Sequence, residues 1–175
     1  MVDVVVYLAC RMSGRSKIAM FKEAREAVSV LSKYGIRCIS PVLEEKIEET
    51  IGLLEVLSEE SLRKEWKKDK EFVKKSHVVF DLSAASPIRS EGATTEYLYA
   101  RFALFHPIIR YFPKGLGPSI TRFENAVIVQ TLDEAGVEIV TRWGTRTQRI
   151  LWRIKERIFW KWLKLLRLQF LGFFR

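Results

Sequence analysis

The segment that decides the fold is Val2–Ala9, which reads VDVVVYLA and is rich in β-branched residues. A short apolar run of this kind predicts a strand that is buried on both faces. Lys17–Tyr34 follows with apolar residues at helical spacing, and Gly35 stands where the glycine after a helix is expected. Ile36–Ile39 predicts a second strand. Together these segments predict a strand–helix–strand unit with a right-handed crossover.

The same alternation continues along the chain. Further strands are predicted at His77–Leu82 (HVVFDL), Pro107–Tyr111 (PIIRY) and Val127–Gln130 (VIVQ), and helices within Glu44–Ser76, at Thr94–Leu104 and, more briefly, at Ile120–Asn125. Alternating strands and helices predict an α/β fold with a five-stranded parallel, doubly wound sheet of the Rossmann-like or flavodoxin-like kind. We expect this domain over residues 1–145 and a basic amphipathic helical tail over residues 146–175.

Composition excludes several classes of protein. With 175 residues, 48% of them hydrophobic, the chain is long enough for one domain with a core. Two cysteines, Cys10 and Cys38, are too few for a disulfide scaffold or a structural zinc site, and no metal centre is expected. Neither GxxxxGK[ST] nor GxGxxG occurs, so we expect neither a nucleoside triphosphatase nor a nicotinamide site, and no cofactor. No secretory signal is visible, which makes the cytoplasm the expected location.

The positive charge is concentrated in the tail. The whole chain carries +9, but residues 146–175 hold nine Lys and Arg against one acid, a net of +8, which leaves +1 for residues 1–145. The basicity therefore describes the tail, and it does not make the body a binder of nucleic acid.

Small polar residues gather where ligands bind in such sheets, at the carboxyl ends of the strands. The loop after the first strand holds Ser13, Gly14 and Arg15, and the junction of the next loop with the Thr94–Leu104 helix holds Ser90, Gly92 and Thr94. Free N–H groups at a helix N-terminus suit a phosphate, and an arginine adds a bidentate charge. Serine and glycine are also ordinary loop residues, so both interpretations stay open.

Two carboxylates fall at the same edge. Glu96 is expected in the first turn of the Thr94–Leu104 helix, where the helix N-terminus would stabilise its anion. Asp81 ends the third strand and shares a strand face with His77. An ionised carboxylate beside a sugar ring is what glycosyl chemistry needs. A solvated first-turn glutamate and an aspartate that organises a loop are the alternatives.

These residues occur in motifs that resemble the nucleoside 2-deoxyribosyltransferase family, including its 2′-deoxynucleoside 5′-monophosphate N-glycosidase branch. Val6–Cys10 (VYLAC) is similar to the YLAG motif of the first strand, and Asp81–Ser83 (DLS) to ADLS at the end of the third strand. Gly92–Ala100 (GATTEYLYA) resembles GxxxELGYA. The resemblance covers roughly residues 2–130 and implies this family's fold.

The resemblance implies a role for each matched residue. Glu96 would be the nucleophile that attacks the anomeric carbon, and Tyr7 would hydrogen-bond it. Ser90 would contact a 5′-phosphate, and Gly14-Arg15 matches the Gly-Arg of the first loop in the monophosphate branch. The implied substrate is a nucleoside or nucleoside 5′-monophosphate, and the implied assembly is a homo-oligomer.

The chain also departs from the family pattern. Cys10 and Leu98 replace glycines, and the acid that assists the leaving base falls at Ser76 or His77. Either His77 or Asp81 would then donate the proton, or the activity is weakened. This leaves two functional hypotheses. One is an enzyme that cleaves the N-glycosidic bond and transfers the sugar to water or another base. The other is a catalytically weakened nucleotide sensor attached to a membrane or partner by its tail.

The tail itself alternates apolar and basic residues. Leu151, Ile154, Ile158, Trp162 and Leu165 recur at helical spacing, and basic residues interrupt the run before it could span a bilayer. Such a helix is typical of peripheral contact with an anionic membrane surface, here the inner face of the cell membrane. A helix docked on the body or on a partner subunit is the alternative, and nucleic acid is a weaker third.

Overall fold

The structure is a computed structural model that describes residues 2–10, 16–44, 59–82, 91–113 and 126–172; for residues 17, 59–62, 65, 91–94 and 163–172 it describes the backbone. In chain order its elements are β1 (Val5–Ala9), α1 (Lys17–Ser32), β2 (Arg37–Ile39), α2 (Pro41–Glu44), α3 (Glu59–Lys75), β3 (Val78–Asp81), α4 (Glu91–Leu98), the π-helical turn η1 (Tyr99–Ala103), β4 (Ile108–Tyr111), β5 (Val127–Val129), α5 (Leu132–Trp143) and α6 (Arg146–Gly172). All five predicted strands are present within a few residues of the expected bounds.

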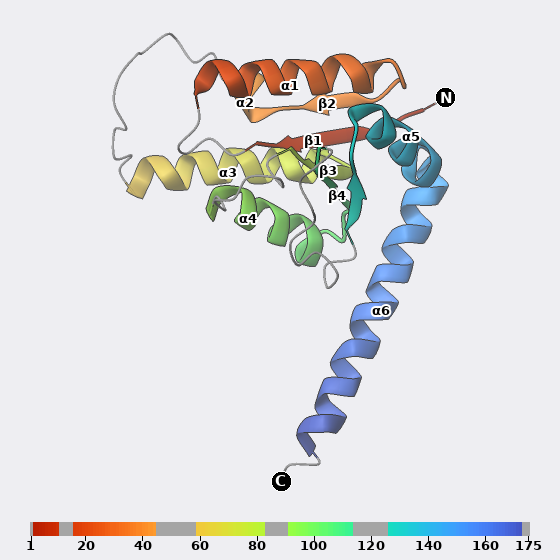
Figure 1. Cartoon of the computed structure of the whole chain (residues 1–175). Coiled ribbons are helices and arrows are strands. Elements are labelled where there is room, and N and C mark those ends of the chain that lie inside the picture. The colour runs from red at the N-terminus through yellow and green to blue at the C-terminus, as the bar shows by residue number, and fades with distance from the viewer. Residues whose placement is uncertain (1, 11–15, 45–58, 83–90, 114–125, 173–175) are drawn as a thin grey trace.

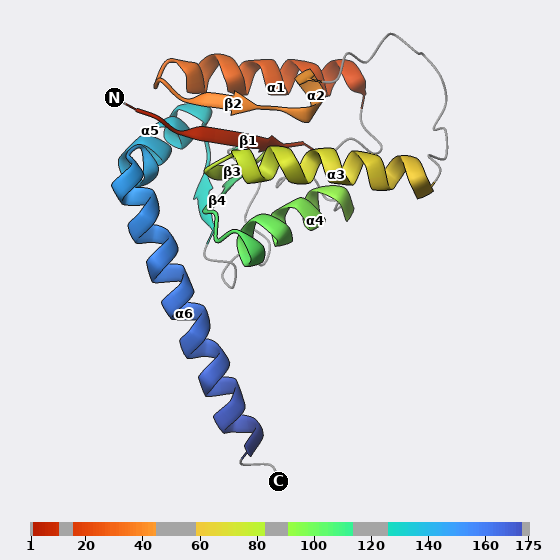
Figure 2. The ribbon, with the colours of Figure 1, turned by 180° about the vertical axis from the view of Figure 1, so that it is seen from behind.

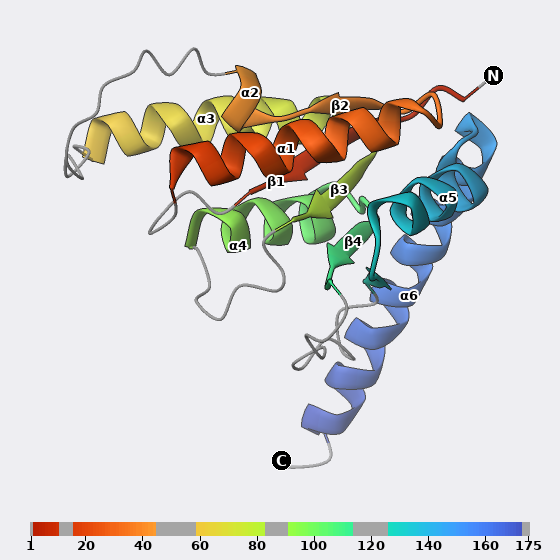
Figure 3. The same cartoon turned by 45° about the horizontal axis from the view of Figure 1, so that its top comes forward.

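The strands form one parallel sheet in the order β2-β1-β3-β4-β5, which confirms the predicted doubly wound fold (Figure 1). Helices α1 and α5 cover one face, and α3 and α4 cover the other (Figure 3). The two faces share out the residues of β1. Val4, Val6 and Leu8 belong to the core beneath α1 and α5, whereas Tyr7 and Ala9 belong to the core beneath α3 and α4.

Gly35 ends the first helix as the sequence predicts. Its φ is +71°, a backbone conformation that side chains other than glycine rarely adopt, and its N–H donates to the carbonyl of Ser32. The chain can therefore turn sharply from α1 into β2, which brings β2 back alongside β1.

The helix that carries Glu96 differs from the prediction. A single helix was expected over Thr94–Leu104, but α4 begins three residues earlier, at Glu91, and gives way to η1 at Tyr99. The charge pattern could not locate this start because Glu91, Thr94 and Glu96 all suit a first turn. Of the helices predicted within Glu44–Ser76, the second is α3, whereas residues 45–58 lie outside the described residues, as does the short helix predicted at Ile120–Asn125.

The last helix leaves the body of the molecule. It starts against α5 and then extends away from the sheet and its covering helices, as two opposite views show (Figures 1 and 2). Among the helices that the structure describes, none combines the length and the apolarity needed to cross a membrane.

Candidate active site

Three of the predicted site residues come together at the carboxyl ends of β1 and β3. Tyr7 is fully buried in β1, and the last residues of the two strands, Ala9 and Asp81, are aligned in the parallel register. Glu96 reaches the same place from α4, where it hydrogen-bonds the Tyr7 side chain and feels the charge of Asp81. This is the edge where doubly wound sheets bind ligands.

The electrostatics of Glu96 are the reverse of the expectation. Because α4 begins at Glu91, Glu96 lies in its second turn, beyond the part of the helix that stabilises an anion best. Burial, and after it the negative charges of Asp69 and Asp81, raise the pKa of Glu96 to about 8. The hydrogen bond with Tyr7 lowers this pKa but does not offset the other effects. The prediction of a stabilised anion in the unliganded protein is therefore wrong.

Asp69 belongs to this cluster although the sequence reasoning did not select it. It lies on α3, three residues after Trp66 and three before Phe72, and it is half-buried like both of them. An edge-on contact between Trp66 and Tyr99, with ring centroids 6.0 Å apart, packs α3 against the end of α4. The signal in the sequence was an acidic residue on the apolar stripe of an otherwise charged helix.

Arg110 is the second residue that the sequence reasoning missed. It is the register partner of Asp81 in the neighbouring strand β4, and its Nε lies 3.9 Å from Asp81 Oδ2. Its guanidinium group also lies 4.8 Å from the ring centroid of Tyr97. A lone arginine in the apolar strand PIIRY was the available signal. The cation holds one carboxylate of the cluster in place at the strand end.

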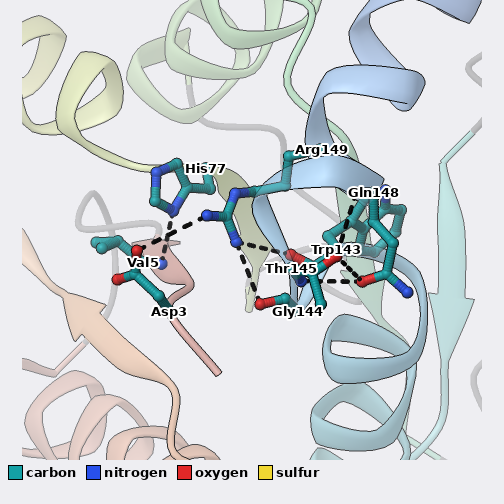
Figure 4. A network of polar contacts seen from close by, with 8 residues as sticks. All are labelled: Asp3, Val5, His77, Trp143, Gly144, Thr145, Gln148 and Arg149. Carbon is teal, nitrogen blue, oxygen red and sulfur yellow. Dashed lines mark hydrogen bonds and ion pairs between the residues drawn. The ribbon is translucent and has the colours of Figure 1, made fainter. Parts of the chain in front are cut away.

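His77 is not part of the cluster. It precedes β3, at the opposite end of the strand from Asp81, so that the two are separated by about 13 Å of strand. Its Nδ1 accepts a hydrogen bond of 3.0 Å from the N–H of Val5, beside Arg149 and the start of α6 (Figure 4). Burial and the charges of Arg149 and Arg153 lower the pKa of His77. His77 and Asp81 were expected on the same face of the strand, but residues on one face can still lie at opposite ends of it. His77 is therefore too far away to protonate a base leaving near Glu96.

The predicted phosphate contacts stay predictions. Ser13, Gly14, Arg15 and Ser90 lie outside the described residues. Gly92 and Thr94 lie in the first turn of α4, whose backbone the structure describes. Across the described part of the chain, no three His, Cys, Asp or Glu side chains are arranged to hold a metal ion.

Comparison with known proteins adds a structural likeness. No protein-family model and no curated protein matches the sequence. A 2-deoxyribosyltransferase from Bacillus psychrosaccharolyticus aligns with a TM-score of 0.56 and 18% identity, covering 75% of this chain and 90% of that one. A conserved protein from Enterococcus faecalis V583 aligns with a TM-score of 0.58 and 13% identity, covering 79% and 98%. The chain thus shares its fold with a 2-deoxyribosyltransferase, the kind of protein that its motifs resemble.

Proposed function

We propose that this protein cleaves the N-glycosidic bond of a nucleoside or nucleoside 5′-monophosphate, with Glu96 as the nucleophile. The observation that carries the proposal is the position of Glu96. It is a largely desolvated carboxyl group, hydrogen-bonded to Tyr7 and close to Asp69 and Asp81, at the ligand-binding edge of a parallel sheet. Several carboxyl groups around one site suit a reaction that needs a nucleophile and an acid.

The reaction would proceed by double displacement. In the first step ionised Glu96 forms a bond to the anomeric carbon while the bond from that carbon to the base nitrogen breaks. Asp81, in its protonated form, gives a proton to the departing nitrogen and becomes the carboxylate. In the second step water or another base attacks the anomeric carbon, the ester with Glu96 breaks, and the carboxylate takes up the nucleophile's proton.

The raised pKa of Glu96 gives this mechanism a specific pH dependence. With a pKa of about 8, Glu96 is protonated in about ten molecules for each ionised one at pH 7. The nucleophile is therefore a minority form in the free protein, and kcat/KM should rise with pH until Glu96 is ionised.

A 5′-monophosphate is the preferred substrate class of this proposal. Arg15 and Ser90 are the residues through which it would be recognised, together with the hydroxyl-rich loops, as in the family that the motifs resemble. A homo-oligomer is part of the same proposal.

The raised pKa also favours a second candidate function, a nucleotide sensor. A Glu96 that stays protonated at neutral pH cannot attack, but it can donate a hydrogen bond to a sugar oxygen. Such a protein would bind a nucleotide without turning it over.

One experiment distinguishes the enzyme from the sensor. The protein is incubated with a panel of ribo- and deoxyribonucleosides and their 5′-monophosphates, at pH values on both sides of the Glu96 pKa. Free base, measured by chromatography, is expected from the wild type and from the matched control Glu138→Gln, which changes a residue of α5 away from the site. None is expected from Glu96→Gln. Tight nucleotide binding without base release at any of these pH values would favour the sensor.

A further inference from the structure

The direction of α6 is set by a polar junction with α5. The Thr145 hydroxyl accepts from the N–H of Gln148, and the Gln148 side chain accepts from the N–H of Thr145, which is a reciprocal cap at the start of the helix. The guanidinium group of buried Arg149 donates to the carbonyl oxygens of Trp143 and Gly144 at the end of α5 (Figure 4). The helix therefore leaves the body at a defined angle.

One face of the first half of α6 packs on the body. Trp152 contacts the fully buried Trp143 edge-on, with ring centroids 5.4 Å apart. One turn further, Glu156 forms an ion pair of 2.7 Å with Arg101, and both side chains are almost fully buried. The next turn places Trp160 against Phe102 of η1, at 5.0 Å between centroids. These contacts account for the body-facing side of the helix.

The opposite face is apolar and exposed. At 100° per residue, Leu151, Ile154, Ile158 and Trp162 lie on the side of the helix roughly opposite to Trp152, Glu156 and Trp160. Their exposed fractions are 61%, 50%, 54% and 64%. We call these four residues the outer stripe. A continuous apolar stripe on the surface of a water-soluble domain marks an interaction site.

The charges beside the outer stripe have one sign. Lys155 flanks it on one side, and Lys161 and Arg157 on the other, and all three side chains are exposed. The only acid between Arg146 and Arg175 is Glu156, which is buried against Arg101. The outward surface of the described helix is thus apolar and cationic, with no carboxylate to balance it.

We propose that α6 is a membrane-surface helix whose outer stripe inserts into a bilayer rich in anionic phospholipid. The apolar side chains would enter the boundary between headgroups and acyl chains, and the flanking lysines and arginine would meet the lipid phosphates. The body lies on the other side of the helix and so would stay in water. A second copy of the chain fits less well, because pairing two outer stripes would bring Lys155, Arg157 and Lys161 of each copy close to like charges.

Vesicle flotation tests the proposal with the full chain. Binding is expected to phosphatidylcholine vesicles that contain about 30% phosphatidylglycerol, to weaken as salt is added, and to be far weaker with phosphatidylcholine alone. Ile154→Glu with Ile158→Glu should weaken binding by more than about 50-fold. Lys155→Gln with Lys161→Gln should weaken it by roughly 30-fold.

Matched controls separate the helix from the rest of the surface. Val137→Glu changes an equally exposed apolar residue of α5, and Lys33→Gln with Lys67→Gln removes two exposed charges of the body; both variants should bind like the wild type. Unchanged thermal unfolding of every variant shows that the fold is intact.

Three results would overturn the proposal. One is no flotation with anionic vesicles at low salt, and another is equal flotation with neutral ones. The third is a wild-type dimer in sedimentation equilibrium that Ile154→Glu with Ile158→Glu dissociates while vesicle binding is absent. In that case a second copy covers the stripe. The base-release assay is done without vesicles, so its result does not depend on any of these three outcomes.

Discussion

The two ends of the sheet both bury ionisable groups, but they treat them differently. At the amino ends, buried Glu156 is matched by Arg101 at 2.7 Å, and Arg149 donates to two carbonyl oxygens. At the carboxyl ends, Glu96 has the carboxyl groups of Asp69 and Asp81 as neighbours, and its pKa rises to about 8. A matched buried charge fixes α6 to the body, whereas an unbalanced one is poised to exchange a proton.

The largest effect should come from removing the unbalanced group. Glu96→Gln is expected to reduce kcat for base release by about a thousandfold or more, because the nucleophile is lost.

The same change, Glu96→Gln, should stabilise the fold. Wild-type Glu96 ionises near pH 4.5 when unfolded and near pH 8 when folded, so its contribution to the stability becomes less favourable as pH rises across that window. Thermal unfolding at several pH values should show the advantage of the variant growing from about pH 4.5 to about pH 8. A variant less stable than the wild type at pH 8 would contradict this view of Glu96.

The matched pair should respond differently when it is broken. Glu156→Gln leaves the buried Arg101 without its partner and should cost about 3–5 kcal/mol in the free energy of unfolding. Replacing both residues by methionine should cost much less, because no lone charge remains. Urea unfolding of the two variants measures the difference. Equal losses would mean that the pair contributes mainly by packing.

The two histidines at the amino ends of the strands, His77 and His106, should affect the stability of the fold at acid pH. Burial and the charge of Arg153 lower the pKa of His106 to about 3, and the pKa of His77 is lowered as well. The unfolded chain takes up these protons below about pH 6.5 while the folded chain does not. The histidines therefore reduce the stability as pH falls from there to about pH 3, a contribution opposite in sign to that of Glu96. His106→Asn should therefore lose less stability than the wild type, measured by the urea midpoint, when the pH is lowered from about pH 6.5 to pH 5. An unchanged slope would assign the acid sensitivity to other groups.

The smallest effects should shift Glu96 without removing it. Asp69→Asn takes away a negative charge that raises the Glu96 pKa, so the rise of kcat/KM with pH should move to lower pH, by about one unit or less. Tyr7→Phe removes the hydrogen bond that lowers this pKa and should move the rise to higher pH. The pH profiles of the two variants measure the shifts. Shifts in the same direction would show that Glu96 does not set the profile.

The sheet could be predicted because its strands are short, apolar and regularly spaced. VDVVVYLA and HVVFDL have no other plausible place in a small α/β domain. The positions of the strand ends indicate Asp81 and Glu96 as site residues, and the resemblance of the motifs adds Tyr7. Asp69 and Arg110 required the packing of α3 and the register of β4, and a sequence pattern carries neither. The pKa of Glu96 depends on burial by neighbours that are distant in the chain.

The separation of charge between body and tail also affects how the molecule moves. Residues 1–145 carry +1 and residues 146–175 carry +8, and the helix that begins the tail projects away from the body (Figures 1 and 2). The molecule is therefore a strong electric dipole with its positive pole along α6. Near any negatively charged surface the molecule will experience a torque that turns α6 towards that surface, so that it is already oriented before the two make contact. Added salt should reduce the rate of productive encounters more than the strength of the contacts that follow.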